Sequence, residues 1–230
     1  MEVPIQAALF LGIIPALFLM FFCLKGYDGY YKDKSIFLTF IAGIFLGVIV
    51  AVVRLRINAE PLVIIFIILY AFLDQLFKTI ILNIRRFQLK KETVIYGLTI
   101  GLGLGSSFTP FLIIIESLSG PINYYYLSLI GFASIGYILF HAATGVYIGF
   151  GIYKGRLIRY LLIAILLQLP FNAISDLIFF RKYFPYVQIG LFIYGLIIFI
   201  YVVKKVMPQI KENNDERKRI KTGVIKNGKK

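Results

Sequence analysis

A small set of polar side chains interrupts a chain of 230 residues that is otherwise strongly apolar. Asp74, Gln75 and Lys78 fall within about one helical turn, and an acid four residues before a base is the favourable order for an ion pair within a helix. His141 is the only histidine in the sequence. We expect these residues to share one polar pocket with four others, so that its members are Asp74, Gln75, Lys78, Ser106, Thr109, His141, Gln168 and Asn172.

These residue types limit the chemistry that such a pocket could perform. One histidine and one cysteine exclude a histidine-rich or cysteine-based metal site within this chain, and we expect no metal and no cofactor. The pair formed by Asp74 and Lys78 has two interpretations, an ion pair that only neutralises itself or a functional pair. His141 likewise is either a hydrogen-bonded interior residue or a catalytic base.

The composition places the chain in a lipid bilayer. Hydrophobic residues make up 60% of the sequence and charged residues 16%, with a mean hydropathy of +0.85. Soluble domains carry about 25% charged residues, so this chain has too few polar groups to cover a surface that faces water. We therefore expect a multi-pass protein of the cell membrane.

Seven stretches are long and apolar enough to cross the hydrocarbon as helices, which takes about 20 residues each. The sequence thus predicts an all-α, polytopic membrane protein, with a seven-span domain over residues 1–206 and a basic, disordered cytoplasmic tail over residues 207–230. The loops are short and leave no room for a soluble domain. The predicted spans are 4–24, 35–53, 61–83, 94–115, 125–150, 157–180 and 186–203.

The positions of Lys and Arg predict the orientation. The first, third and fifth loops and the tail contain most of the 25 Lys and Arg residues, whereas the fourth loop, 116–124, contains none. Because cytoplasmic loops are enriched in Lys and Arg, we expect the N-terminus outside and the C-terminus in the cytoplasm. The charged tail either serves this topology alone or also attracts anionic membrane lipids. Nucleic-acid binding is not expected, since no folded nucleic-acid-binding domain accompanies the charges.

Glycines at a regular spacing predict close helix packing in two spans. Gly97, Gly101 and Gly105 are four residues apart, and such a tandem G-x-x-x-G stripe lets another helix approach closely in lipid. Gly145 and Gly149 share a helical face with His141.

The polar residues of four spans also share a depth. At about 1.5 Å of rise per residue, four of them lie roughly 14 to 18 Å from the cytoplasmic ends of their predicted spans. We therefore expect a single polar layer in the inner half of the membrane. These four residues are Asp74, Ser106, His141 and Gln168.

Three of the spans resemble helices of PrsW-type and CAAX-type intramembrane proteases. The segment FLDQLFKTIIL resembles their E-E-x-x-K helix, with Asp74 and Gln75 at the acidic positions and Lys78 at the basic one. The segment LFHAATGVYIGFG resembles their histidine helix through His141, and LLQLPFNAI resembles their H-G-L-x-N helix, with Gln168 in place of the histidine and the asparagine retained. Where PrsW proteins carry E-N in the fourth span, this chain has Phe108 and Thr109, so two acids and one histidine of the protease pattern are replaced.

A non-catalytic relative in the same superfamily is more similar. The chain resembles the Aph (anterior-pharynx-defective) scaffold subunit of gamma-secretase, a seven-span protein with its N-terminus outside. The tandem glycines match in spacing, His141 matches the buried histidine of the fifth span in an H-x-x-x-G setting, and Gln168 stands where that family has a second histidine.

The resemblance to the Aph family implies a non-catalytic scaffold. It would pack against a presenilin-like intramembrane aspartyl protease through its glycine helix, and its polar layer would hydrogen-bond rather than catalyse. Two alternatives remain open. One is a divergent PrsW-like protease that uses Asp74 and His141, with Gln168 orienting a water. The other is a membrane protein that binds a lipid or solute in the same pocket.

Overall fold

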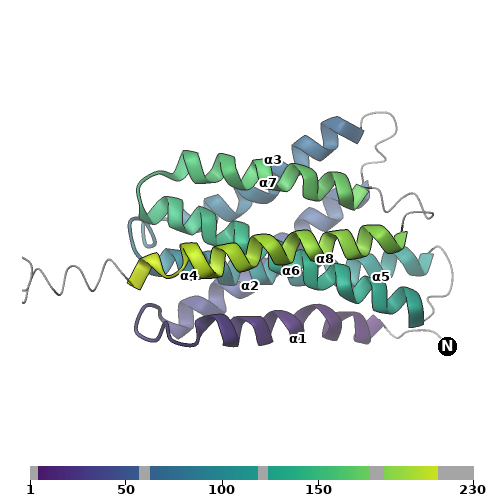
Figure 1. The fold of residues 1–230 in the computed structure, drawn as a ribbon, viewed down its shortest axis with the longest axis horizontal. Coiled ribbons are helices and arrows are strands. Elements are labelled where there is room, and N and C mark those ends of the chain that lie inside the picture. Colours follow the sequence, from purple (N-terminus) through teal and green to yellow (C-terminus); the bar gives the residue numbers. More distant parts are fainter. Residues whose placement is uncertain (1–4, 57–62, 119–123, 177–183, 212–230) are drawn as a thin grey trace, which may run out of the picture.

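The protein is a bundle of helices that run side by side along its longest axis (Figure 1). The computed structural model describes residues 5–56, 63–118, 124–176 and 184–211. Within these ranges every regular element is helical, which confirms the predicted all-α class. The elements are α1 (Ile5–Leu24), α2 (Asp33–Arg56), α3 (Val63–Leu82), α4 (Glu92–Ser106), α5 (Phe108–Leu118), α6 (Tyr124–Tyr153), α7 (Leu157–Asp176), α8 (Phe184–Tyr201) and a π-helical turn, η3 (Val202–Val206).

Six helical segments of the described residues are long and apolar enough to cross a membrane, as expected of a multi-pass membrane protein. The first predicted span corresponds to α1, in which the structure describes a shorter apolar helical stretch, Phe10–Leu24. The count of seven spans therefore stays a prediction, as does the orientation of the termini. The six segments are Asp33–Val53, Ile64–Leu82, Glu92–Phe111, Leu127–Tyr153, Leu157–Ser175 and Pro185–Lys211.

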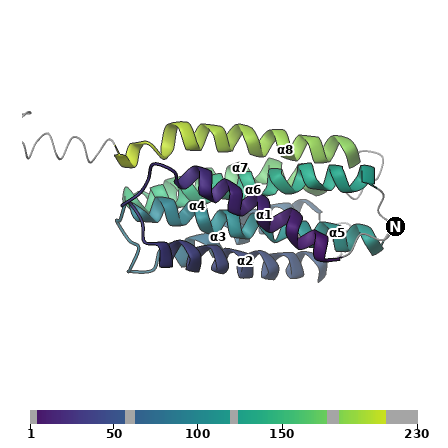
Figure 2. The same ribbon diagram turned by 90° about the horizontal axis from the view of Figure 1, so that it is seen from below.

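Two helices, α4 and α6, form the centre of the bundle. In Figure 2 α2 and α8 lie on opposite sides, with α4 and α6 between them, and the same order of neighbours holds in the packing. The remaining helices cover the central pair from the sides, α1 on one flank and α3 with α7 on the other. Every residue of α4 from Thr93 to Ser106 is buried, so this helix meets protein on all sides.

The fourth predicted span is broken near its middle, where α4 ends at Ser106 and α5 begins at Phe108. Pro110 explains the break, since proline has no N–H to donate to the carbonyl four residues earlier, that of Ser106. This carbonyl points at Gly12 of α1, where an added Cβ would overlap it. A residue without a side chain in α1 therefore lets that helix pack directly on the break.

Charged side chains of the described loops gather at one end of the bundle. The α1–α2, α3–α4 and α6–α7 connections meet there with the end of α8 (Figure 1). Most of these charged residues are basic. They are Lys25, Asp28, Lys32, Asp33, Lys34, Arg85, Arg86, Lys90, Lys91, Glu92, Lys154, Arg156, Arg159, Lys204, Lys205 and Lys211.

The folded domain extends beyond residue 206, where the sequence predicts a disordered tail to begin. Met207 and Ile210 are fully buried, and the Lys211 ammonium lies 4.0 Å from the centre of the Tyr27 ring, at cation–π distance. These contacts keep residues 207–211 on the α1–α2 loop. The rest of the predicted tail, 212–230, lies outside the described residues.

Candidate functional site

The polar residues of α3 turn toward the interior of the bundle. Asp74, Gln75 and Lys78 have no exposed surface, whereas Phe72, one of the apolar residues on the other side of the helix, is 42% exposed. Residues three or four apart share a helical face, so the spacing in the sequence places the polar atoms of this helix toward α6 and α7.

Side-chain amides connect α3 to α7. The Gln75 amide nitrogen donates to the Gln168 carbonyl oxygen at 2.6 Å, and the Gln168 amide nitrogen donates to Asp74 Oδ2 at 3.1 Å and to Asn172 Oδ1 at 2.9 Å. The Asn172 amide nitrogen in turn donates to the backbone carbonyl of Ile67 at 3.1 Å. Gln168 is thus the centre of the α3–α7 contact, because it uses both amide hydrogens and its carbonyl.

A lysine connects α3 to α6. Lys78 Nζ lies 2.6 Å from the Thr144 hydroxyl and 3.3 Å from His141 Nδ1. Which of the two nitrogens donates in the contact between Lys78 and His141 depends on the tautomer of the imidazole ring. The Thr144 hydroxyl is oriented in turn by the carbonyls of Phe140 and His141, each 3.2 Å away.

Aromatic rings enclose the imidazole of His141. The Phe108 ring is stacked on it at 5.4 Å between centroids, and the Phe140 and Phe171 rings meet it edge-on at 5.6 and 6.2 Å. His141 itself has no exposed surface. This apolar enclosure lowers the local dielectric constant, which strengthens the hydrogen bond with Lys78 and makes an unpaired charge costly.

We call the buried residues that join α3, α6 and α7 the polar layer. It contains one acidic and one basic side chain, Asp74 and Lys78, one turn apart on the same helix. Its members are Asp74, Gln75, Lys78, His141, Thr144, Gln168 and Asn172.

Two residues of the predicted pocket lie elsewhere. The Ser106 hydroxyl donates to the Gly103 carbonyl of its own helix at 2.7 Å. The Thr109 hydroxyl is hydrogen-bonded to that of Ser134, which also lies 3.5 Å from the carbonyl of Leu11. Pro15, four residues after Leu11, frees that carbonyl, since it has no N–H. Thr109 therefore belongs to a separate polar contact between α1, α5 and α6.

The predicted packing glycines all lie between α4 and α6. A Cβ on Gly97 would overlap the carbonyl of Gly145, and one on Gly101 would overlap that of His141. Gly105 packs in the same way against Ile138. The remaining packing glycine, Gly149, faces the carbonyl of Thr93. The glycine face that the resemblance assigns to a partner protein is thus filled by a helix of this same chain.

Other buried polar residues escaped the prediction. Thr144 could have been found, because it is three residues from His141 and so on the same face. Gln188 of α8 has no such signal. It is fully buried, and its side-chain nitrogen and oxygen have no hydrogen-bond partner among the described residues.

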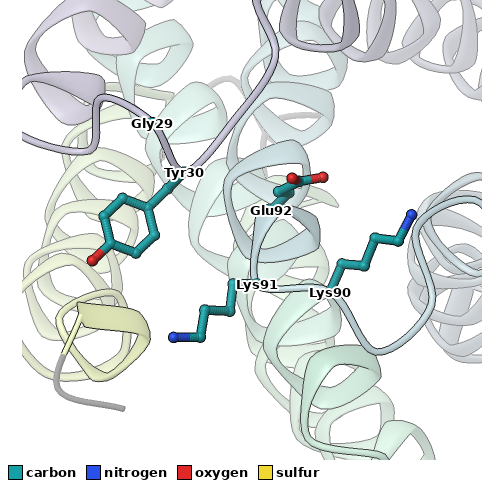
Figure 3. A pocket seen from close by; sticks show the side chains of 5 residues that line it. All are labelled: Gly29, Tyr30, Lys90, Lys91 and Glu92. Atoms are coloured by element: carbon teal, nitrogen blue, oxygen red, sulfur yellow. The ribbon is translucent and has the colours of Figure 1, made fainter. Parts of the chain in front are cut away.

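The two pockets described on the surface do not include any residue of the polar layer. One, of about 280 Å³, lies where the α1–α2 and α3–α4 loops meet and is lined by Gly29, Tyr30, Lys90, Lys91 and Glu92 (Figure 3). In Figure 3 the side chains of its two lysines point away from each other, so they do not converge on one anion. The other is lined by the end of α1 and the loop after it, from Leu17 to Tyr31.

The donor set does not suit a metal centre. Among the described residues no group of three or more His, Cys, Asp and Glu side chains comes together.

Comparisons with protein-family models, with curated proteins and with solved structures found no match for this chain.

Proposed function

We propose that this chain is a non-catalytic scaffold of the membrane, and that the polar layer is a brace that holds α3 and α7 on the central helices. One observation carries the proposal, the direct hydrogen bonding among the side chains of the layer. Gln168 uses both amide hydrogens and its carbonyl oxygen within the bundle, and Lys78 is held by His141 and Thr144.

Burial of the layer supports a brace over a reaction centre. A protease must bring a peptide bond and a water to its catalytic groups, yet Asp74, His141 and Gln168 have no exposed surface and aromatic rings enclose the imidazole. A lipid or solute site would need space among these side chains, and they hydrogen-bond directly to one another instead. Each of these features favours a structural role.

The resemblance to the Aph family supports the partner class. We propose a presenilin-like intramembrane aspartyl protease as the partner, seven membrane spans and a cytoplasmic C-terminus. The basic residues at one end of the bundle support this orientation. Because α6 fills the glycine stripe of α4, the partner has to contact the outer helices rather than Gly97, Gly101 and Gly105.

Co-expression with a presenilin-type protease tests the proposal. We expect the protease to co-purify with the full chain and to unfold at a higher temperature in its presence, because a partner that binds only the folded state stabilises it. The full chain purified alone should leave a fluorogenic transmembrane peptide uncut. Absence of a complex would contradict the scaffold, and cleavage by the purified chain that His141→Ala abolishes would establish the protease alternative.

A further inference from the structure

The α3–α4 loop and the start of α7 lie side by side at the basic end of the bundle and form an exposed surface there. Residues 83–91 of the loop lie against the α6–α7 connection, where a Cβ on Gly155 would be 3.8 Å from the Leu89 side chain. Basic and apolar side chains are exposed together on this surface. They are Ile84, Arg85, Arg86, Leu89, Lys90, Arg156, Ile158 and Arg159, and we call them the loop surface.

Hydrogen bonds and one buried ring give the loop a defined shape. Phe87 is buried and its ring lies 5.0 Å from that of Tyr96 on α4. The Thr93 hydroxyl donates to the Phe87 carbonyl, and the Gln88 amide donates to the Asn83 carbonyl at 2.9 Å. With Phe87 anchored inward, the residues on either side of it are presented outward.

Leu89 adopts a conformation that leucine rarely takes. Its φ is +57°, the single positive value among the described residues other than glycine, and its side chain is 69% exposed. Left-handed backbone costs energy for a residue with a Cβ, and strained residues of this kind cluster at binding and active sites. A glycine would fit this turn without strain, so an outward-facing leucine here calls for something that contacts its side chain.

The position of the apolar residues identifies that contact as lipid. Ile80 of α3 and Leu162 of α7 are exposed on the outer faces of their helices, as lipid-facing residues are. Ile84 and Leu89 follow the end of α3, and Ile158 lies in the first turn of α7; their side chains are 52%, 69% and 75% exposed. They therefore lie where the hydrocarbon meets the headgroups.

Charge complementarity then selects the class of lipid. Five of the eight residues of the loop surface are basic, and one acidic residue, Glu92, lies next to it, where it lines a pocket with Lys90 and Lys91. We propose that the loop surface binds the headgroups of anionic phospholipids, with Arg and Lys on the phosphates and the three apolar side chains among the upper acyl carbons. Guanidinium groups suit this role because they can hold a phosphate by two parallel hydrogen bonds.

The α1–α2 loop at the same end of the bundle is a natural control. It also carries three basic residues, Lys25, Lys32 and Lys34, but Asp28 and Asp33 lie among them. Its Tyr27 side chain is buried rather than exposed. The same number of positive charges can therefore be removed from either loop.

The test measures lipid retention by native mass spectrometry of the full chain in detergent, with phosphatidylglycerol and phosphatidylcholine of identical acyl chains as probes. We expect the wild type to retain phosphatidylglycerol preferentially. The triple variant R85Q/R86Q/K90Q should lose that preference by roughly fivefold in affinity per basic residue removed. The control triple K25Q/K32Q/K34Q should stay within about twofold of the wild type. Circular dichroism and size-exclusion chromatography show which variants are folded.

A second variant tests the apolar contact independently. Leu89→Gly suits the positive φ, so it should fold at least as stably as the wild type while its phosphatidylglycerol affinity falls. Equal losses of phosphatidylglycerol affinity in the two triple variants would mean that the lipid responds only to the total charge at this end of the bundle. That result would overturn the proposal. Wild-type indifference between the two lipids, or undiminished binding by L89G, would overturn it as well. None of these outcomes depends on whether the chain has a protein partner.

Discussion

Replacing Gln168 by leucine removes the residue on which the contact between α3 and α7 depends. Leucine is close to glutamine in volume, so the packing is largely kept while three hydrogen bonds are lost. Those bonds join Gln168 to Asp74, Gln75 and Asn172 at 3.1, 2.6 and 2.9 Å. The free energy of unfolding of Gln168→Leu should therefore fall by the sum of these bonds.

The size of the loss follows from the partners. A side-chain hydrogen bond between membrane helices contributes about 0.6 kcal/mol on average, so the bonds to Gln75 and Asn172 contribute about 1.2 kcal/mol together. The bond to Asp74 involves a carboxylate, and bonds to charged groups contribute about 1.5 to 3 kcal/mol. We therefore expect Gln168→Leu to lower the free energy of unfolding by about 3 kcal/mol.

Gln188 offers a matched control within the same molecule. It is also fully buried in a membrane helix, but its amide has no hydrogen-bond partner among the described residues. The same exchange, Gln188→Leu, removes an unsatisfied polar group from an apolar interior, so it should leave stability unchanged or raise it by about 1 kcal/mol.

Both variants can be measured by unfolding in mixed micelles as the fraction of sodium dodecyl sulfate is raised. Far-ultraviolet circular dichroism follows the helices, and fluorescence of the 16 tyrosines reports on packing, since the sequence contains no tryptophan. The expected order of stability is Gln188→Leu, wild type, Gln168→Leu. Equal destabilisation by the two exchanges would refute the reasoning, because the cost would then come from losing a buried amide and not from losing its hydrogen bonds.

Two further predictions concern packing and pH. Gly101→Ala should lower the free energy of unfolding by about 2 kcal/mol or more, because the new methyl group overlaps the His141 carbonyl. Gly131→Ala should be neutral or slightly stabilising, since no neighbouring atom lies within 4 Å of the added Cβ. Thermal unfolding in detergent compares the two variants. Burial raises the pKa of Tyr27 above its usual value, with Cys23 and Tyr30 adding to the effect. Its contribution to stability is therefore complete below about pH 10 and is lost as the pH rises further, so Tyr27→Phe should lessen alkaline unfolding, as followed by circular dichroism.

The membrane class and the helical fold were predictable from composition and from lengths of apolar sequence. Both follow from the apolar membrane interior, because backbone N–H and C=O groups in hydrocarbon have to be hydrogen-bonded within a helix. The end of the folded domain was not predictable in this way. Residues 207–211 look like the start of a charged tail, yet Lys211 lies over the ring of Tyr27, far away in the sequence.

The positions of polar residues along the predicted spans indicated part of the polar layer. Residues at one depth on different helices can meet, and Asp74, Lys78, His141 and Gln168 do lie together. Depth alone does not say which way a side chain points. Ser106 shares that depth, but its hydroxyl bonds to its own helix.

The sequence by itself determined that this protein is helical, belongs in a bilayer, and carries two glycine faces and a few polar groups at one depth. Only the tertiary structure decided that the two glycine faces meet each other rather than a foreign helix. The physical reason is that composition and helical periodicity are properties of residues near each other in the chain. Which face meets which depends on the simultaneous packing of all the helices, where the carbonyl of His141 fits against Gly101 because neither helix has a side chain in the way.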